Sequence, residues 1–330
     1  METNKTIVAD VEQVNEMIKQ GKVLVIAADY RILRRLTAGN WIGGSIPYFM
    51  TSAGGIFSRD KAVVIDLSPY IEEFKIVEYS EDRIGDIPKN YYEHGFNYIL
   101  IPGFSGALRN FAFQTERIFE FFYSPLVGWV TGVALEELNE MFPIVFNGKS
   151  MNESDDSALV LHARLKDNLV AKVDIINIFE PDPESDIFIF ENDGFEIFEC
   201  FINGERRVLA EYLKERNIDK SHPFVADYNG YSINISIKDI TDIFVETFAP
   251  VRMGVKYRLA KRLSSYEKEF SLRIPQYQPE VVSSFNCIYN YVFGKLESKK
   301  LPYTGPFTFG EIAYILLNQT MVNLKIVPKE

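Results

Sequence analysis

Continuous runs of apolar residues mark the expected strands in the N-terminal half of the chain. Residues 22–28, 61–67 and 96–101 each have the length of a strand and are rich in Val, Leu and Ile. Such runs are typical of strands that are buried on both faces of a sheet. Apolar residues recur at helical spacing in residues 9–20, and again after residue 106, where a glycine turn follows the third run. This pattern predicts strands and helices that alternate along the chain.

Strand patterns dominate after residue 157. The expected strands there are 158–165, 170–179, 186–190, 195–202, 231–237, 243–249 and 320–326. An Asp-Gly pair separates the third of these from the fourth, and such a pair between alternating apolar residues indicates a hairpin. Helices are expected at 204–216, 287–296 and 309–317. Residues 37–55 are rich in glycine and aromatic residues but have no period, so they predict a structured loop.

These elements together predict a mixed α/β (α+β) fold, with two lobes of mixed sheet flanked by helices. Residues 180–186 are acidic and contain two prolines, a composition that is typical of a boundary. We therefore expect one domain at 1–185 and a second at 186–330. The alternative is that residues 180–186 form a long turn between strands of one sheet.

Charge and cysteine content narrow the choice of partners and compartment. The 330 residues carry a formal net charge of −11, and an acidic surface repels phosphate backbones and anionic lipid headgroups. We therefore expect no nucleic acid and no membrane as partner. The chain has no apolar run long enough to span a bilayer and no signal-peptide pattern at its start. Its two cysteines, Cys200 and Cys287, lie far apart, which fits a reducing compartment and a cytoplasmic location without a metal site.

Cys287 is the candidate nucleophile. It stands at the start of an expected helix, where a thiol has a lowered pKa. A packed, inert thiol is the alternative, because cysteine is among the most frequently buried residues. A Cys-His hydrolase or transferase would need His94, His162 or His222 to approach Cys287 through folding. Among these, His162 lies in an apolar strand pattern and is expected to be a hydrogen-bonded core residue.

Glu311 is a second candidate. Thr308 and Glu311 have the spacing of a capping box, in which both side chains bond to free amides at a helix start. In that case the carboxylate is structural. If it instead faces a pocket, its natural partner is a ligand ammonium group.

Two glycine-rich segments could contribute to a pocket. The turn at residues 103–106 precedes a helix, so its amides and Arg109 could hold a carboxylate or another anion. Gly43 and Gly44 stand between Trp41 and Tyr48, whose rings could form an apolar wall with polar tips. The alternatives are a tight strand-to-helix turn and a loop fixed to the core by its rings.

The C-terminal segments carry a family resemblance. Residues 283–291 read SSFNCIYNY, residues 305–313 read GPFTFGEIA, and Asn318-Gln-Thr320 enters the last strand. Residues 195–326 thereby resemble the C-terminal domain of FIST proteins, and the glycine-rich segments at 39–45 and 51–55 resemble the N-terminal domain of that family more loosely. The chain is thus similar to a divergent bacterial FIST protein.

The resemblance implies a sensory, signal-transduction domain that binds a small ligand such as an amino acid or another small carboxylate. Together with the candidate residues above, it leads us to expect the ligand between the two lobes, near Gly43, Gly44, Tyr48, Arg109, Cys287, Gly310, Glu311 and Asn318. Since the chain has no kinase, cyclase or similar output module, a signal would pass to a partner protein or through self-association. We expect no cofactor, although haem-based gas sensing by some FIST relatives keeps haem open, and a thiol-dependent or carboxylate-based enzyme is the alternative to a sensor.

Overall fold

The computed structural model describes residues 6–115, 117–228, 231–276 and 278–329. Strands make up 44% of the chain and helices 19%, and both types are interleaved in mixed sheets, which confirms the predicted mixed α/β class. No helix in the described ranges has the length and apolar character needed to cross a bilayer.

Three six-stranded sheets form the main body. The first has the order β1 (Thr6–Ala9), β6 (Ala62–Asp66), β2 (Leu24–Ala28), β3 (Trp41–Ser45), β10 (Val145–Asn147) and β11 (Asn152–Ser154). The second has the order β26 (Ile315–Leu317), β25 (Gly310–Ala313), β9 (Leu126–Thr131), β8 (Gly95–Pro102), β12 (Ala158–Leu165) and β7 (Ile71–Tyr79). The third has the order β13 (Leu169–Asn177), β27 (Thr320–Pro328), β23 (Val281–Cys287), β24 (Gly305–Thr308), β4 (Tyr48–Thr51) and β5 (Gly54–Phe57).

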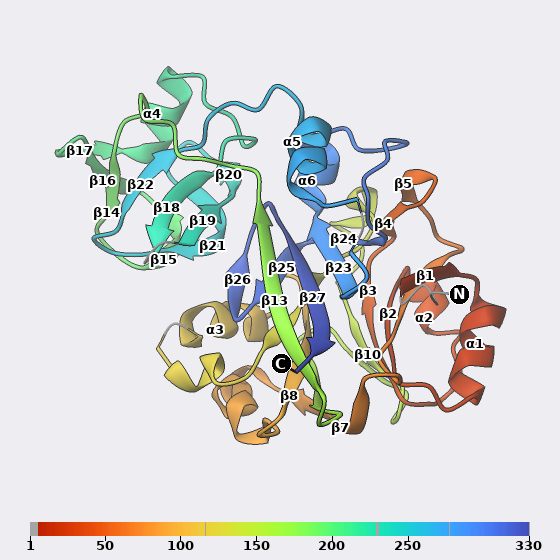
Figure 1. Ribbon diagram of the computed structural model, residues 1–330. Helices are drawn as coiled ribbons and strands as arrows, with labels where there is room; N and C mark the ends of the chain where they lie inside the picture. The colour runs from red at the N-terminus through yellow and green to blue at the C-terminus, as the bar shows by residue number, and fades with distance from the viewer. Residues whose placement is uncertain (1–5, 116, 229–230, 277, 330) are drawn as a thin grey trace.

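Two further sheets form a small lobe, which stands apart from the main body at the upper left of Figure 1. One sheet has the order β17 (Glu205–Val208), β16 (Glu199–Ile202), β14 (Phe188–Phe190), β22 (Lys256–Leu259), β18 (Phe224–Tyr228) and β19 (Tyr231–Ile235). The other contains β15 (Gly194–Ile197), β21 (Val245–Val251) and β20 (Ile237–Ile240). The chain enters this lobe after β13 and leaves it before the helix α5, so two connections join the lobe to the body (Figure 1).

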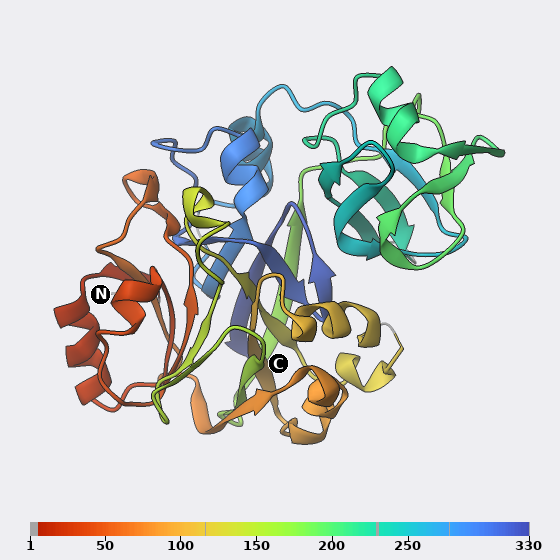
Figure 2. The ribbon, with the colours of Figure 1, turned by 180° about the vertical axis from the view of Figure 1, so that it is seen from behind.

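Helices cover the outer faces of the sheets. The α-helices are α1 (Val11–Lys19), α2 (Tyr30–Leu33), α3 (Gly106–Gln114), α4 (Leu209–Glu215), α5 (Tyr266–Arg273) and α6 (Ile288–Phe293), and the 3-10 helices are η1 (Glu81–Asn90), η2 (Phe119–Phe122) and η3 (Leu135–Glu137). The capping box at the start of α1 is reciprocal, because the Asp10 carboxylate accepts from Gln13 N and the Gln13 side chain accepts from Asp10 N. Figure 2 shows α3 on the side of the main body that faces the small lobe.

The expected domain boundary at residue 185 falls where the chain enters the small lobe. Strands that follow the lobe return to the main body, because β27 pairs with β13, β25 pairs with β9 and β24 pairs with β4. Two of the three sheets of the main body therefore contain strands from both expected domains, 1–185 and 186–330.

Several expected elements are confirmed and others are wrong. The buried strands at 22–28, 61–67 and 96–101 are confirmed as β2, β6 and β8. The structured loop expected within 37–55 is instead three strands, β3, β4 and β5. The glycines of this segment allow close packing of β3 against β9. A Cβ atom on Gly44 would lie 2.8 Å from both Trp129 Nε1 and Thr131 Cγ2.

Two further corrections concern later segments. The helix expected at 309–317 consists of strands β25 and β26, because its backbone groups pair with the edge of β9 instead of with one another. The hairpin expected across the Asp-Gly pair is not formed by consecutive strands. Strands β14 and β16 do pair, but the residues between them form β15, which pairs with β21.

Candidate functional site

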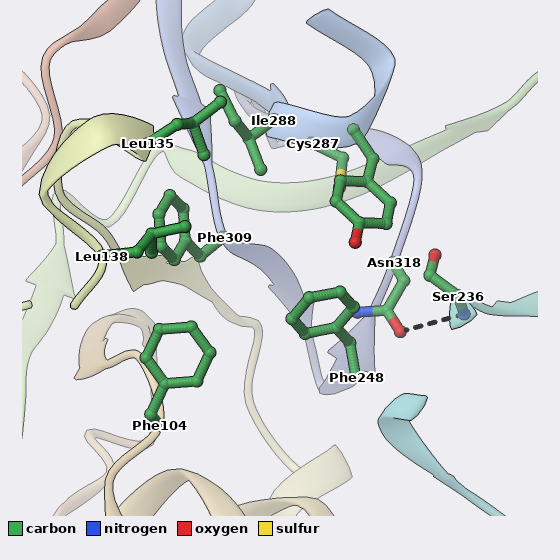
Figure 3. Close-up of a pocket in the computed structure, with 10 residues that line it drawn as sticks. Phe104, Leu135, Leu138, Ser236, Phe248, Cys287, Ile288, Phe309 and Asn318 are labelled. Carbon is green, nitrogen blue, oxygen red and sulfur yellow. Dashed lines mark hydrogen bonds between the residues drawn. The ribbon is translucent and has the colours of Figure 1, made fainter. Parts of the chain in front are cut away.

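Two adjoining cavities lie between the main body and the small lobe. The first, which we call the Cys287 cavity, has a volume of about 90 Å³ and is lined by Phe104, Leu135, Leu138, Ser236, Phe248, Cys287, Ile288, Tyr289, Phe309 and Asn318 (Figure 3). The second, the Arg109 cavity, has a volume of about 220 Å³ and includes the turn at 103–106, Arg109, Phe195, Lys238 and Glu246 in its wall. Both are lined by Phe104, Phe248 and Phe309. The two cavities therefore belong to one cleft with a shared aromatic wall.

The cleft is built from both bodies. Phe104 follows β8, Phe309 connects β24 to β25, and both belong to the main body. Phe248 lies in β21 and Ser236 connects β19 to β20, so the small lobe supplies the opposite wall. The cleft is therefore formed at the interface between the two bodies, by side chains at the ends of strands from different sheets. Interfaces of this kind are a frequent location of ligand pockets.

Cys287 lies where β23 ends and α6 begins. The carboxyl of Glu311 and the backbone amides of Tyr289 and Gln319 are the neighbouring groups that act on the pKa of its thiol. Burial raises the pKa of the thiol well above its ordinary value, and the neighbouring Glu311 raises it further. The lowered pKa expected from the helix start is therefore wrong, because α6 is short and desolvation is the larger effect. Cys287 lines the cleft as a neutral thiol.

Glu311 lies directly behind Cys287, in β25, and is fully buried. One carboxyl oxygen, Oε2, accepts from Thr320 N at 3.1 Å and from Thr320 Oγ1 at 2.9 Å, and Thr308 Oγ1 lies 3.3 Å from Oε1. Burial raises its pKa to about 8, although the bonds from Thr320 oppose that shift. The expected capping box is wrong, because residues 308–311 are extended and no helix starts there. Since Glu311 lines neither cavity, it reaches a ligand only through Cys287.

Arg109 projects from α3 into the wall of the second cavity. Its guanidinium lies 5.3 Å from the ring centroid of Phe195, and it forms no ion pair with any other residue that the structure describes. Nearby, Lys238 and Glu246 pair at 2.6 Å. The anion cradle expected at the turn is wrong, because the amides of Gly103, Ser105 and Gly106 already donate within the protein, to Thr131 O, Pro102 O and Asp156 Oδ1 in that order.

Asn318 joins the two bodies at the cleft. Its Oδ1 lies 3.4 Å from the amide nitrogen of Ser236, which donates to it (Figure 3). Next to it, Ser236 Oγ donates to Gln319 Oε1 at 2.7 Å, and Asn234 Nδ2 donates to the carbonyl of Asn318 at 3.2 Å. These groups are buried. The polar contacts therefore fix the small lobe against the start of β27.

The remaining predicted site residues lie behind the walls of the cleft. Tyr48 Oη accepts from the amide of Leu135, which lines the Cys287 cavity. Gly310 packs beneath Val130 and Leu316, which line the Arg109 cavity. Gly43 and Gly44 are buried within β3 and line neither cavity, so their predicted contact with the ligand is wrong for these two cavities.

The three histidines, all of which the structure describes, lie away from Cys287. His162 Nδ1 donates to Asn97 Oδ1 at 2.6 Å and its Nε2 accepts from Tyr79 Oη at 2.8 Å, and burial lowers its pKa to about 3. This confirms the expected hydrogen-bonded core position. His94 contacts the carbonyl of Lys166, and His222 lies beside Asp219. None of the three lines either cavity, so a Cys-His pair is not assembled at this cleft.

The aromatic wall of the cleft was not predicted from the sequence. Phe104, Phe248 and Phe309 are three of 26 phenylalanines, and nothing in their local pattern separates them from core residues. One partial signal was present in the sequence, because Phe104 stands between glycine and serine in the turn before α3. The structure shows that Phe104 adopts a positive φ of 67° there.

The model of a family described as a family of unknown function (DUF6976) matches residues 9–327. No curated protein matches the sequence. The similarity to FIST proteins remains a prediction. Because the match spans nearly the whole chain, including all residues that line the cleft, the chain belongs to the DUF6976 family.

Proposed function

We propose that this protein binds a small organic acid in the cleft between the main body and the small lobe, and that it acts as a sensor. The observation that carries the proposal is the position of Arg109, a cation without an ion-pair partner in the described structure, in a cavity with an aromatic wall. Pockets for small molecules are mostly apolar and contain a few polar groups that fix orientation.

The charges around the Arg109 cavity favour an anion. Lys238 and Glu246 neutralise each other at 2.6 Å, whereas Arg109 has no ion-pair partner among the residues that the structure describes. A guanidinium presents two parallel N–H groups that match the geometry of a carboxylate. An aromatic or aliphatic acid would therefore place its carboxylate at Arg109 and its apolar part against Phe104, Phe248 and Phe309.

Sensing requires that the bound ligand alters the protein. A molecule in this cleft contacts both bodies, so it stabilises whichever relative position of the bodies it fits better. The signal would then pass to a partner protein or to a second copy of the chain. We expect this function in the cytoplasm, consistent with two unpaired and buried cysteines.

The proposal is tested with 4-methylbenzoate, and with 4-methylbenzylamine as a ligand of similar shape and opposite charge. We expect the acid to raise the melting temperature and the amine to leave it unchanged, because only a ligand of the folded state stabilises it. Arg109→Gln should weaken binding of the acid by roughly tenfold or more, since a hydrogen bond to a charged group contributes about 1.5–3 kcal/mol. Isothermal titration calorimetry measures both affinities.

Arg83→Gln is the matched control, because Arg83 is an exposed residue that pairs with Asp86 outside the cleft. Its variant should bind the acid as the wild-type protein does. Equal affinity of the acid for Arg109→Gln and for the wild-type protein would remove the basis for an anion site at this position.

A further inference from the structure

Three phenylalanine rings stand where the two cavities of the cleft meet. Phe104, Phe248 and Phe309 line the Cys287 cavity and also line the Arg109 cavity. Figure 3 shows the ring of Phe104 across the cavity from Cys287. Because these rings belong to the walls of both cavities, they form the partition between them.

Phe104 is the least fixed of the three rings. The ring of Phe309 packs tightly against Gly132, where an added Cβ atom would lie 2.3 Å from it. Phe248 lies in β21, and its ring meets that of Tyr289 edge-on at 5.2 Å between centroids. Phe104 stands in a turn instead, and its exposed fraction is 50%. A change in the partition therefore depends first on Phe104.

The backbone of Phe104 has an unfavourable conformation. Its φ of 67° is uncommon for a residue with a Cβ atom. Hydrogen bonds fix the turn on both sides, from Gly103 N to Thr131 O at 3.2 Å and from Ser105 Oγ to Pro102 O at 2.7 Å. Such conformations persist where the surrounding structure imposes them, and they cluster at ligand sites. Glycine would adopt this φ without steric cost, so the backbone alone does not explain a phenylalanine here.

Both bodies hold the ring of Phe104 in place. On the side of the main body, Phe309 meets it edge-to-face, with 6.0 Å between ring centroids. From the small lobe, Lys238 Nζ lies 5.3 Å from the ring centroid, within the range of a cation–π contact. Lys238 is itself oriented by its ion pair with Glu246. The partition therefore depends on the position of the small lobe against the main body.

The sizes of the two cavities decide which acids fit. An apolar cavity of about 150 Å³ is enough to hold benzene. The Arg109 cavity, at about 220 Å³, has room for one aromatic ring and its carboxylate, whereas the Cys287 cavity, at about 90 Å³, is too small for a ring. An acid with a second ring opposite its carboxylate would have to displace Phe104.

We propose that Phe104 determines the specificity of the cleft and restricts its ligands to acids with a single ring. The inference rests on the proposed function, because the carboxylate of the acid binds at Arg109. The ring of Phe104 contacts the apolar part of a short acid and blocks the path of a longer one. Such a block contributes to specificity because it weakens the binding of the larger competitor.

The experiment compares 4-methylbenzoate with biphenyl-4-carboxylate by isothermal titration calorimetry. The wild-type protein should bind 4-methylbenzoate at least tenfold more tightly, because a misfit in an apolar pocket costs roughly tenfold or more in affinity. Phe104→Gly should bind biphenyl-4-carboxylate roughly tenfold more tightly than the wild-type protein does, since the two cavities then join. It should bind 4-methylbenzoate more weakly, because an apolar contact is lost. A general loosening of the fold would weaken the binding of both acids.

Phe104→Asn is the second variant. It also removes the ring, and asparagine tolerates a positive φ, so the affinities for the two acids should change in the same directions as in Phe104→Gly. Phe119→Ala is the control, because Phe119 is an exposed phenylalanine of η2 that lines neither cavity. This variant should bind both acids as the wild-type protein does.

The outcomes separate the two proposals. If the wild-type protein binds 4-methylbenzoate and both variants at Phe104 keep its preference for the smaller acid, Phe104 does not set specificity and the binding function stands. Equal affinity of the wild-type protein for the two acids would show that the cleft has no such size limit, and the binding function would again stand. If the wild-type protein binds neither acid, both proposals are wrong.

Discussion

Two buried ionisable side chains, His162 and Glu311, show how burial controls charge in this protein. Burial lowers the pKa of His162 to about 3, so it is neutral where it bridges Tyr79 and Asn97. Burial raises the pKa of Glu311 to about 8, so it is largely neutral behind Cys287. Both shifts follow from the cost of holding a charge away from water. The interior therefore keeps two hydrogen-bonded groups in their uncharged forms.

The shift of Glu311 makes stability depend on pH. The side chain of the unfolded chain ionises near pH 4.5, whereas the folded protein keeps the proton until about pH 8. The folded state binds more protons in this interval, so this contribution is complete below pH 4.5 and is lost as pH rises toward 8. The slope is at most about 1.4 kcal/mol per pH unit.

Glu311→Gln should remove this slope, because glutamine has the shape of a neutral carboxyl and cannot ionise. Relative to wild type, we expect the free energy of unfolding of the variant to gain about 1–3 kcal/mol between pH 5.5 and pH 8. Urea denaturation at the two pH values measures the difference. Glu16→Gln, at an exposed position of α1, is the control and should show no such gain. A constant difference between Glu311→Gln and wild type would contradict the assigned pKa.

At the scale of elements, glycine decides where strands can approach. Gly128 in β9 pairs with Ile99 in β8, and a Cβ atom at Gly128 would lie 1.7 Å from the carbonyl oxygen of Ile99. Its φ of 155° is also rarely adopted by other residues. Because the obstacle is backbone of a central strand, it cannot move aside as a flexible side chain would. The pairing of β8 with β9 therefore requires glycine here.

Gly128→Ala should destabilise the fold by more than about 3 kcal/mol or prevent folding, since overpacking against rigid backbone is costly. Gly194→Ala is the matched strand control, because the nearest atom to its added Cβ is 3.9 Å away. That variant should stay within about 0.5 kcal/mol of wild type. Thermal and urea unfolding compare them, and similar stability of both variants would contradict the steric argument.

At the scale of the whole molecule, the small lobe is attached to the main body by buried polar contacts beside the cleft. Asn234 Nδ2 donates to Asn177 Oδ1 at 2.9 Å and lies within hydrogen-bonding distance of the carbonyls of Asn318 and Gln319. Across the same interface, Arg252 donates to the carbonyl of Ala112 in α3. Such an interface can shift between alternative arrangements more readily than an apolar one.

Asn234→Ala should loosen the two bodies, because it leaves buried carbonyls without donors. We expect a loss of about 1–3 kcal/mol in unfolding free energy and faster amide exchange at residues 318–320 and in β19. Hydrogen exchange measured by mass spectrometry detects the local effect. Asn40→Ala, which removes one exposed bond to the Gly21 carbonyl, is the control. Unchanged protection at residues 318–320 would show that Asn234 does not hold the lobe in place.

Local pattern predicted the buried strands well, because a run such as 96–101 is apolar wherever it lies in the fold. It failed at 309–317 and 37–55, where pairing with β9 and packing against Trp129 override the local preference. At the site, the sequence correctly indicated three residues that line the cleft, Cys287, Arg109 and Asn318. They could be recognised because a thiol, a guanidinium and an amide can each react with or bind a ligand. The aromatic wall was not found, since a phenylalanine in a pocket and one in a core have the same local sequence.

The sequence by itself determined the mixed α/β class, most of the buried strands, the acidic charge and the supply of reactive groups, since these depend on composition and on short-range periodicity. Only the tertiary structure decided that the chain leaves and re-enters the main body, that Glu311 lies behind Cys287 in a strand, and that Arg109 faces the small lobe. The physical reason is that these arrangements depend on strand pairing and burial between residues far apart in the sequence, such as Glu311 in β25 and Trp129 in β9. Distances of this kind leave no periodic signal in the chain.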